Sequence, residues 1–212
     1  YKQSSTLNTE LNRNPSYPIT KLHEKRLERP RGQRYIPNFI IYRVLGQPVV
    51  DINDWRLKIT GLVEKTIEYT FNELLRLPMK RIIRDFHCVT GWSVKNIVWE
   101  GIPLNILIKK AKPKPEAKWV YTRSLDGYTT IIHIEDFLSE DSLLVIKIND
   151  KLLSLEQGYP ARIFIPHLYG WKGTKWVTEI RLLSKYVDGY WEMLGYHERG
   201  NVLFEERFKA MR

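Results

Sequence analysis

The chain has 212 residues, a formal net charge of +10 from 34 Lys and Arg against 24 Asp and Glu, and 43% hydrophobic residues. This balance excludes a disordered, collagen-like or coiled-coil chain, and the length suffices for one large domain or two small ones. The single cysteine, Cys88, excludes an internal disulfide and any zinc or iron–sulfur site built from several cysteines. No apolar run approaches the roughly 20 residues that a membrane-spanning helix needs.

The first 34 residues carry half of the net positive charge, with eight Lys or Arg against three Glu. Pro15, Pro18 and Pro30 disfavour regular structure there, which predicts an irregular basic arm over residues 1–34 and a domain over residues 35–212. The arm could be a solvated segment or could bind nucleic acid or another anionic surface. We favour the first interpretation, because no recognised nucleic-acid motif accompanies the charge.

The arm also bears on location, because it is the part of the chain where a signal peptide would lie. It contains no apolar stretch of the kind that a signal peptide needs. One cysteine is compatible with the cytoplasm. We therefore expect a cytoplasmic protein, or an exported one if a leader has been removed.

The first half of the domain is predicted to mix strands and short helices. Alternation of apolar and polar residues indicates strands, and the capping-box spacing of Thr70 and Glu73 opens a helix that Pro78 ends. Pro103 suits the first turn of a second helix. The expected strands are Trp55–Val63, Thr66–Thr70 and Ile82–Val89, and the expected helices are Phe71–Leu77 and Pro103–Lys110.

The second half is predicted to be mostly strand, because its segments are rich in β-branched and apolar residues. Turns at Asp126-Gly127 and Asn149-Asp150 separate some of these segments. The expected strands are Lys118–Thr122, Thr129–Ile134, Leu143–Ile148, Ala161–Ile165 and Lys175–Leu183. With no internal repeat and no low-complexity linker, the sequence favours one α+β domain that is mainly β.

Cys88 lies at the end of a predicted strand, shortly before Gly91, where a side chain can reach a ligand. The thiol is open to three interpretations: an inert buried residue, a nucleophile or a ligand of a soft metal. The five histidines do not form a zinc site, because no two of them have the spacing of zinc ligands.

Glycines and cations are concentrated in two later segments, Gly158–Arg162 and Tyr169–Trp176. Glycine lets the backbone approach a ligand closely, and Arg162, Lys172 and Lys175 would attract a phosphate. The alternative is a pair of turns with solvated cations. The chain has neither a Walker A motif nor Gly-x-Gly-x-x-Gly, so no nucleoside triphosphate or Rossmann site is expected.

The run Asp85–Ser93, followed by Trp99–Leu104, resembles the molybdopterin-binding domain of the sulfite oxidase superfamily. The resemblance extends over about residues 35–208. The C-terminal part of the chain is similar to the small, single-domain prokaryotic branch of the superfamily. The further motifs in the expected order are Ser124–Tyr128, Gly158–Arg162, Pro166, Tyr169-Gly170, Lys172, Lys175-Trp176, Gly189–Glu192, Gly195–His197 and Glu206–Phe208.

The resemblance implies a molybdenum–molybdopterin cofactor, with Cys88 as the catalytic residue and the protein's thiolate ligand to the metal. A polarisable sulfur suits such a site. After the Trp119 strand, the resemblance implies that either Arg123 or Ser124 contacts the cofactor. The other implied cofactor-binding residues are Asn38, Ile41, Tyr42, Gln157, Arg162, Gly173, Thr174 and Lys175.

The implied reaction is a two-electron oxygen-atom transfer on a small S- or N-oxide or a sulfite-like substrate. Sulfite oxidases carry arginines a few residues after the metal-binding cysteine, whereas Lys95 is the only cation here. That departure favours a reductase of S- or N-oxides, and the periplasmic catalytic subunit that reduces methionine sulfoxides is one related model. We expect a separate electron-transfer partner and no nucleic-acid partner. The alternative is a basic nucleic-acid- or anion-binding module on the same scaffold without metal.

Overall fold

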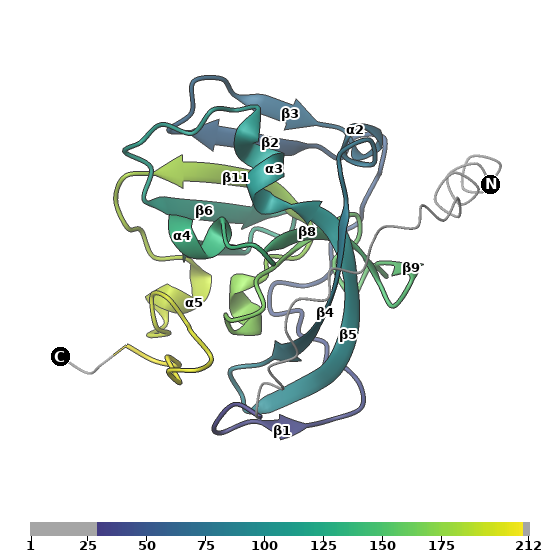
Figure 1. The fold of residues 1–212 in the computed structure, drawn as a ribbon, viewed down its shortest axis with the longest axis vertical. Coiled ribbons are helices and arrows are strands. Elements are labelled where there is room, and N and C mark those ends of the chain that lie inside the picture. The colour runs from purple at the N-terminus through teal and green to yellow at the C-terminus, as the bar shows by residue number, and fades with distance from the viewer. Residues whose placement is uncertain (1–28, 210–212) are drawn as a thin grey trace.

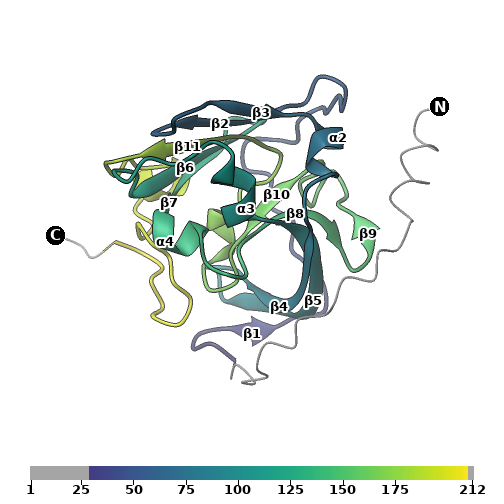
Figure 2. The same cartoon turned by 45° about the horizontal axis from the view of Figure 1, so that its top comes forward.

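The computed structural model describes residues 29–209, in which two β-sheets pack against each other with short helices beside them (Figures 1 and 2). Most of the predicted basic arm, residues 1–28, lies outside the described residues. The described end of the arm lies against the domain, since Gln33 is only 4% exposed and Arg34 begins the first strand. The mainly β, α+β architecture predicted from the sequence is confirmed.

The first sheet has six strands in the order β1-β5-β8-β10, with β4 paired to β5 and β9 paired to β8. Strand β5 is the longest and pairs with three neighbours, of which β1 is parallel and β4 and β8 are antiparallel. Its curved course alongside β4 is clear in Figure 1. The strands are β1 (Arg34–Tyr35), β4 (Lys80–His87), β5 (Trp92–Pro103), β8 (Leu143–Ile148), β9 (Lys151–Leu152) and β10 (Arg162–Phe164).

The second sheet has five strands in the order β3-β2-β11-β6-β7, of which β2 and β11 are parallel. The strands are β2 (Leu57–Gly61), β3 (Ile67–Tyr69), β6 (Trp119–Ser124), β7 (Thr129–His133) and β11 (Val177–Leu183). The helices are α2 (Phe71–Leu74), α3 (Leu104–Lys109), α4 (Ile134–Phe137), the 3₁₀ helix η1 (Gly170–Lys172) and α5 (Tyr190–Met193). Over residues 29–209, none of these helices is long and apolar enough to cross a membrane.

The strands β1 and β9 and the helices α4, η1 and α5 were not predicted, and two further differences have a clear physical reason. The capping box of Thr70 and Glu73 is present, but α2 ends at Leu74 and not at Leu77. Strand β5 was not expected at all, because residues 92–103 lack alternation. Their side chains are buried along most of the strand, since β5 lies in the centre of its sheet.

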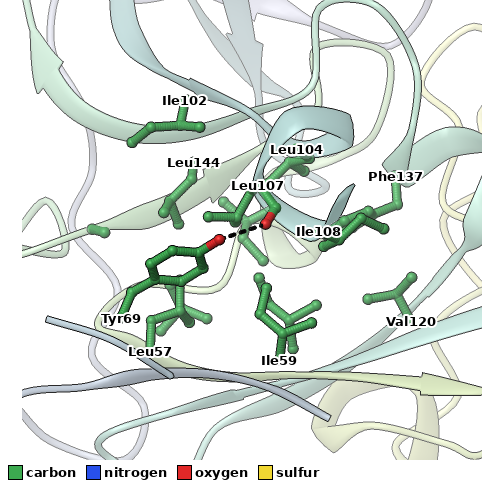
Figure 3. Packing of buried hydrophobic residues seen from close by; sticks show 14 of the residues in the cluster. Leu57, Ile59, Tyr69, Ile102, Leu104, Leu107, Ile108, Val120, Phe137 and Leu144 are labelled. Atoms are coloured by element: carbon green, nitrogen blue, oxygen red, sulfur yellow. Dashed lines mark hydrogen bonds between the residues drawn. The ribbon is translucent and has the colours of Figure 1, made fainter. Parts of the chain in front are cut away.

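The main hydrophobic core lies between the second sheet, α3 and the end of β5, as Figure 3 shows. Leu57 and Ile59 of β2 face Leu107 of α3, and all three side chains are fully buried. The Tyr69 hydroxyl donates a hydrogen bond of 3.2 Å to the Leu107 carbonyl, which ties the edge strand β3 to the helix. A second, more aromatic cluster lies in the first sheet, where the rings of Trp99 and Phe164 stack with centroids 3.8 Å apart.

The Leu107→Ala variant is expected to lower the free energy of unfolding by about 2–5 kcal/mol, because it removes a fully buried side chain and leaves a cavity. Urea denaturation measures this loss. Leu138→Ala is the matched control, because Leu138 is exposed and its truncation should cost about 0.5 kcal/mol or less. Equal losses in the two variants would contradict this account of the core.

Candidate active site

A cavity of about 260 Å³ lies where loops from both sheets meet. The first sheet contributes the turn after β4 and the start of β10, and the second sheet contributes the turn between β6 and β7. Its lining residues are Phe39, Ile40, Ile41, Tyr42, Arg43, Val44, Phe86, Cys88, Val89, Thr90, Trp92, Ser124, Asp126, Tyr128, Glu156, Gln157, Arg162, Gly170, Trp171, Gly173, Lys175, Trp176, Trp191 and Tyr196. The only thiol of the chain therefore lines a space large enough for a ligand.

Cys88 lies in the tight turn that joins β4 to β5. Its amide donates to the Trp92 carbonyl at 2.8 Å, and the Gly91 amide donates back to the Cys88 carbonyl at 3.1 Å. Gly91 has a φ of +91°, a conformation that glycine adopts without steric cost, so the chain can reverse within four residues. The half-buried Sγ atom lies 3.2 Å from the Thr90 hydroxyl oxygen. The turn therefore presents the thiol to the cavity.

The structure separates the two alternatives after the Trp119 strand. Side chains alternate across β6, so Ser124 is buried and lines the cavity while Arg123 is exposed beside Glu179. The Ser124 hydroxyl oxygen is buried without a hydrogen-bond partner. Ser124 is thus the residue of the pair that could contact a cofactor.

One end of the cavity is cationic. Arg162 is buried at the start of β10, and burial lowers its pKa to about 10, which leaves it charged at neutral pH. Its Nη1 donates to the Gln157 carbonyl at 3.2 Å, whereas its buried Nε has no partner. Burial, and then repulsion from Arg162, lower the pKa of Lys175 to about 8. Lys175 Nζ donates to the Tyr42 carbonyl at 2.6 Å, which joins the segment before β2 to this end.

A second group of lining residues, which we call the aromatic end, packs beside the Cys88 turn. The Trp191 and Tyr196 rings stack with centroids 5.0 Å apart, and Trp171 meets Tyr196 edge-on at 5.1 Å. Val89, the neighbour of Cys88, packs against the same cluster as these rings. The aromatic end is therefore packed next to the turn that carries the thiol.

A buried ion pair holds the aromatic end in place. Lys172 Nζ lies 2.6 Å from a carboxylate oxygen of Glu192, and both side chains are at most 1% exposed. The same ammonium donates to the carbonyls of Ile131 and Glu198 at 2.6 Å. The same Glu192 oxygen accepts the indole N–H of Trp171 at 3.2 Å. This network connects η1, β7, α5 and the C-terminal segment.

Most of the predicted site residues come together at the cavity. Those that line it are Ile41, Tyr42, Cys88, Ser124, Gln157, Arg162, Gly173 and Lys175. Three others do not line it: Asn38 is exposed, Arg123 is on the opposite side of β6, and Thr174 is buried in a 2.6 Å hydrogen bond to Thr122. Thr174 therefore anchors the loop that carries Gly173 and Lys175.

Three further residues, Tyr128, Trp191 and Tyr196, line the cavity although the sequence did not single them out. All three stand in segments that carried the family resemblance, so the motifs marked the segments but not the residues. Tyr128 donates a hydrogen bond of 2.5 Å to the Trp171 carbonyl. Burial and the charge of Glu192 raise the pKa of Tyr128 well above its ordinary value, so the phenol stays protonated at neutral pH.

Comparison with known protein families identifies the family of the chain. Residues 44–191 match the family model of the oxidoreductase molybdopterin binding domain, and the chain belongs to that family. The protein is a molybdenum-dependent oxidoreductase, and its cofactor is molybdenum–molybdopterin. The family predicted from the sequence motifs is therefore confirmed.

The chain is also similar to individual oxidoreductases. The chain is 38% identical over 180 residues to the oxidoreductase YuiH of Bacillus subtilis, covering 84% of this chain and 91% of YuiH. It is 34% identical to the protein-methionine-sulfoxide reductase catalytic subunit MsrP of Gluconobacter oxydans, covering 69% of this chain and 52% of MsrP. The crystal structure of the sulfane dehydrogenase SoxCD from Paracoccus pantotrophus matches with a TM-score of 0.62 and 30% identity, over 67% of this chain and 41% of that one.

The Lys172→Met variant is expected to lower the free energy of unfolding by about 3–5 kcal/mol, because it leaves the buried Glu192 carboxylate without its counter-ion. Urea denaturation measures this loss. The control is Lys58→Met, which removes an exposed ion pair with Glu68 and should change stability by less than about 1 kcal/mol. A Lys172→Met protein as stable as the control would show that the pair does not hold this end of the site.

Proposed function

We propose that the protein reduces S-oxides at a molybdenum centre bound by the Cys88 thiolate. In this proposal Arg162, Lys175, Gln157, Gly173 and Ser124 hold the pterin and its phosphate, and a separate protein supplies the electrons. The observation that carries the proposal is that one cavity is lined by the only thiol of the chain, by the cations Arg162 and Lys175, and by the aromatic rings of Trp171, Trp191 and Tyr196.

The residues of the cavity suit the cofactor chemically. The Ser124 hydroxyl and the Arg162 Nε are buried without partners, and a buried polar atom without a partner is costly unless a ligand satisfies it. Arg162 and Lys175 supply the positive charge that a phosphate requires. Cys88 supplies a soft thiolate, the ligand type that suits a metal also held by sulfur atoms of an organic group.

When bound, the molybdenum–molybdopterin group supplies two-electron oxygen-atom transfer. The chain binds this group, orients it and shields it from water. The β4–β5 turn fixes the backbone of Cys88, and the cationic end fixes the anionic part of the cofactor. The stacked rings of Trp191 and Tyr196 exclude water from the side of the thiol.

The polarity of the aromatic end favours a neutral sulfoxide over sulfite. Sulfite is an anion, and of the cationic side chains that line the cavity, Arg43, Arg162 and Lys175, this proposal assigns Arg162 and Lys175 to the cofactor. Lys95, the cation that follows the cysteine in sequence, lies 3.9 Å above the Tyr35 ring and does not line the cavity. A sulfoxide next to aromatic rings needs no counter-ion and gains sulfur–aromatic contact.

Methionine sulfoxide within a polypeptide is the substrate that we favour. The MsrP relatives are named as protein-methionine-sulfoxide reductases. The cavity also has an apolar rim, since Ile40 and Tyr42 line it and are 48% and 56% exposed. Such a rim can contact the residues that flank a methionine. The alternative of a nucleic-acid-binding module without metal gains no support from these relatives, and a cytoplasmic or exported location stays a prediction.

The Cys88→Ser variant is expected to lose activity by several orders of magnitude while it remains folded, because a hydroxyl is a poor ligand for this metal. Both proteins would be produced in a host that makes the cofactor. Elemental analysis would give molybdenum per chain, and reduced viologen dye would drive the reduction of an N-acetyl methionine sulfoxide peptide, with sulfite oxidation by ferricyanide as the comparison. Full turnover by Cys88→Ser would overturn the metal assignment, and sulfite oxidation faster than sulfoxide reduction would overturn the substrate.

Arg162→Gln is expected to lower the pterin content of the purified protein about tenfold or more, since it removes the buried charge at the cofactor end. The pterin is measured by its fluorescence after release and oxidation. Arg123→Gln is the matched control, because the side chain of Arg123 is exposed outside the cavity. The assignment of the cationic end fails if both variants retain the pterin equally well.

A further inference from the structure

We infer that Gln33 and Arg207, which come from opposite ends of the described chain, are positioning residues that set the orientation of Cys88. The inference rests on the proposed function, because it takes Cys88 as the metal ligand. Neither residue lines the cavity. Both contact the Cys88 turn through its backbone carbonyls, from outside the cavity.

Gln33 holds the turn from the N-terminal side. Its Nε2 donates to the Cys88 carbonyl at 3.1 Å, and its Oε1 accepts a hydrogen bond of 2.9 Å from the Ser93 hydroxyl. Ser93 lies in turn 2.8 Å from Nδ1 of His87. All three side chains are buried, so the amide is held at both of its polar atoms and water cannot replace it.

The backbone next to Gln33 adds two further contacts with the turn and with β5. The Arg34 amide donates to the Gly91 carbonyl at 2.8 Å, and the Ile36 amide donates to the Ser93 carbonyl at 2.9 Å. These bonds are the parallel pairing of β1 with the start of β5. The segment that precedes the domain core is thus fixed to the turn by both its backbone and its side chain.

Arg207 holds the turn from the C-terminal side. Its Nη1 donates to the Val89 carbonyl, and its Nη2 donates to the Gly32 carbonyl at 3.1 Å. The guanidinium also lies over the Tyr169 ring, 5.3 Å from its centroid. One guanidinium therefore joins the cysteine turn, the N-terminal segment and the C-terminal segment, which its planar arrangement of donors allows and a lysine could not reproduce.

Glycines at two positions make this close approach possible. A Cβ atom on Gly32 would lie 2.6 Å from Arg207 Nη2, and a Cβ atom on Gly91 would lie 3.1 Å from the Gly32 carbonyl oxygen. Both glycines have positive φ values, +68° and +91°. The turn is therefore packed against the backbone of the N-terminal segment, which is in turn packed against side chains of the C-terminal segment. A shift of either segment moves the carbonyls of Cys88 and Val89.

These contacts matter for the thiol because the backbone determines where its Sγ atom points. Thr90, a member of the same turn, is the one side chain recorded within hydrogen-bond distance of Sγ in residues 29–209. Fixing the carbonyls of residues 88 and 89 fixes the plane of the turn and hence the direction of the Cα–Cβ bond of Cys88. Partners that orient a metal ligand in this way tune the metal as well as its affinity.

The test compares Gln33→Met and Arg207→Met with the wild-type holoenzyme. Both variants keep an unbranched side chain and remove the donors. The main readout is the electron paramagnetic resonance spectrum of the paramagnetic molybdenum, because its g values depend on how the thiolate sulfur is oriented toward the metal. We expect shifted g values in both variants and a fall in kcat of about 10- to 100-fold. Arg207→Lys, which keeps the charge and can reach one carbonyl, should give intermediate g values.

Arg199→Met controls for a general loss of stability. Arg199 is another arginine of the C-terminal segment, and it forms two hydrogen bonds to Asp136, at 2.9 and 3.0 Å, away from the Cys88 turn. Its variant should have a lower melting temperature but wild-type g values. If Arg207→Met does not fold, Gln33→Met tests the inference, because the Gln33 side chain contacts only the turn and its neighbours.

The outcomes separate this inference from the proposed function. If Cys88→Ser leaves the wild-type spectrum unchanged, the thiolate is not a ligand and the proposed function fails. If Cys88→Ser changes the spectrum while Gln33→Met and Arg207→Met keep wild-type g values, only the positioning role is overturned. Shifted g values in Arg199→Met equal to those of Arg207→Met would also overturn it, because the effect would then be general.

Discussion

The buried ammonium of Lys172 is the interaction on which the geometry of the site depends most. A charge that is nearly inaccessible to water must be fully paired, and here the partners come from β7, α5 and the segment after it. Satisfying that one charge brings β7 and the α5 region, which are distant in sequence, to Lys172 of η1. Trp171, next to Lys172, and the Tyr196 ring that packs on it then form the wall beside Cys88.

The two ends of the cavity divide the work of the enzyme. Arg162 and Lys175 are desolvated cations, which makes them favourable partners for an anionic cofactor and disfavours leaving them unoccupied. The aromatic end offers a neutral surface beside the thiol. In the proposed function the cofactor uses the charge, and the substrate is recognised by shape and polarizability. This division explains why a member of this family with few cations near its cysteine can still bind an anionic cofactor.

The site could be predicted from the sequence only in part, and the reason differs between residues. Cys88 and Arg162 stand in motifs that carry the family resemblance, and the resemblance implies their roles. Ser124 could not be separated from Arg123, because the choice depends on which face of β6 meets the cavity. Strand β5 could not be predicted, because it is buried along most of its length and its sequence shows no alternation of apolar and polar residues. The sequence places Gln33 in a solvated arm, because its hydrogen-bond partners lie 55 or more residues away and leave no local pattern.

The sequence by itself determined the mainly β fold, the family, the cofactor and the cysteine, because local patterning and ordered motifs carry that information. The tertiary structure decided which side of β6 faces the ligand, where the cationic and aromatic ends of the cavity lie, and that both terminal segments pack against the cysteine turn. These features depend on contacts between residues far apart in the chain. Arg207 and Val89 show the reason plainly: a guanidinium and a carbonyl separated by 118 positions leave no local signal, and only folding brings them together.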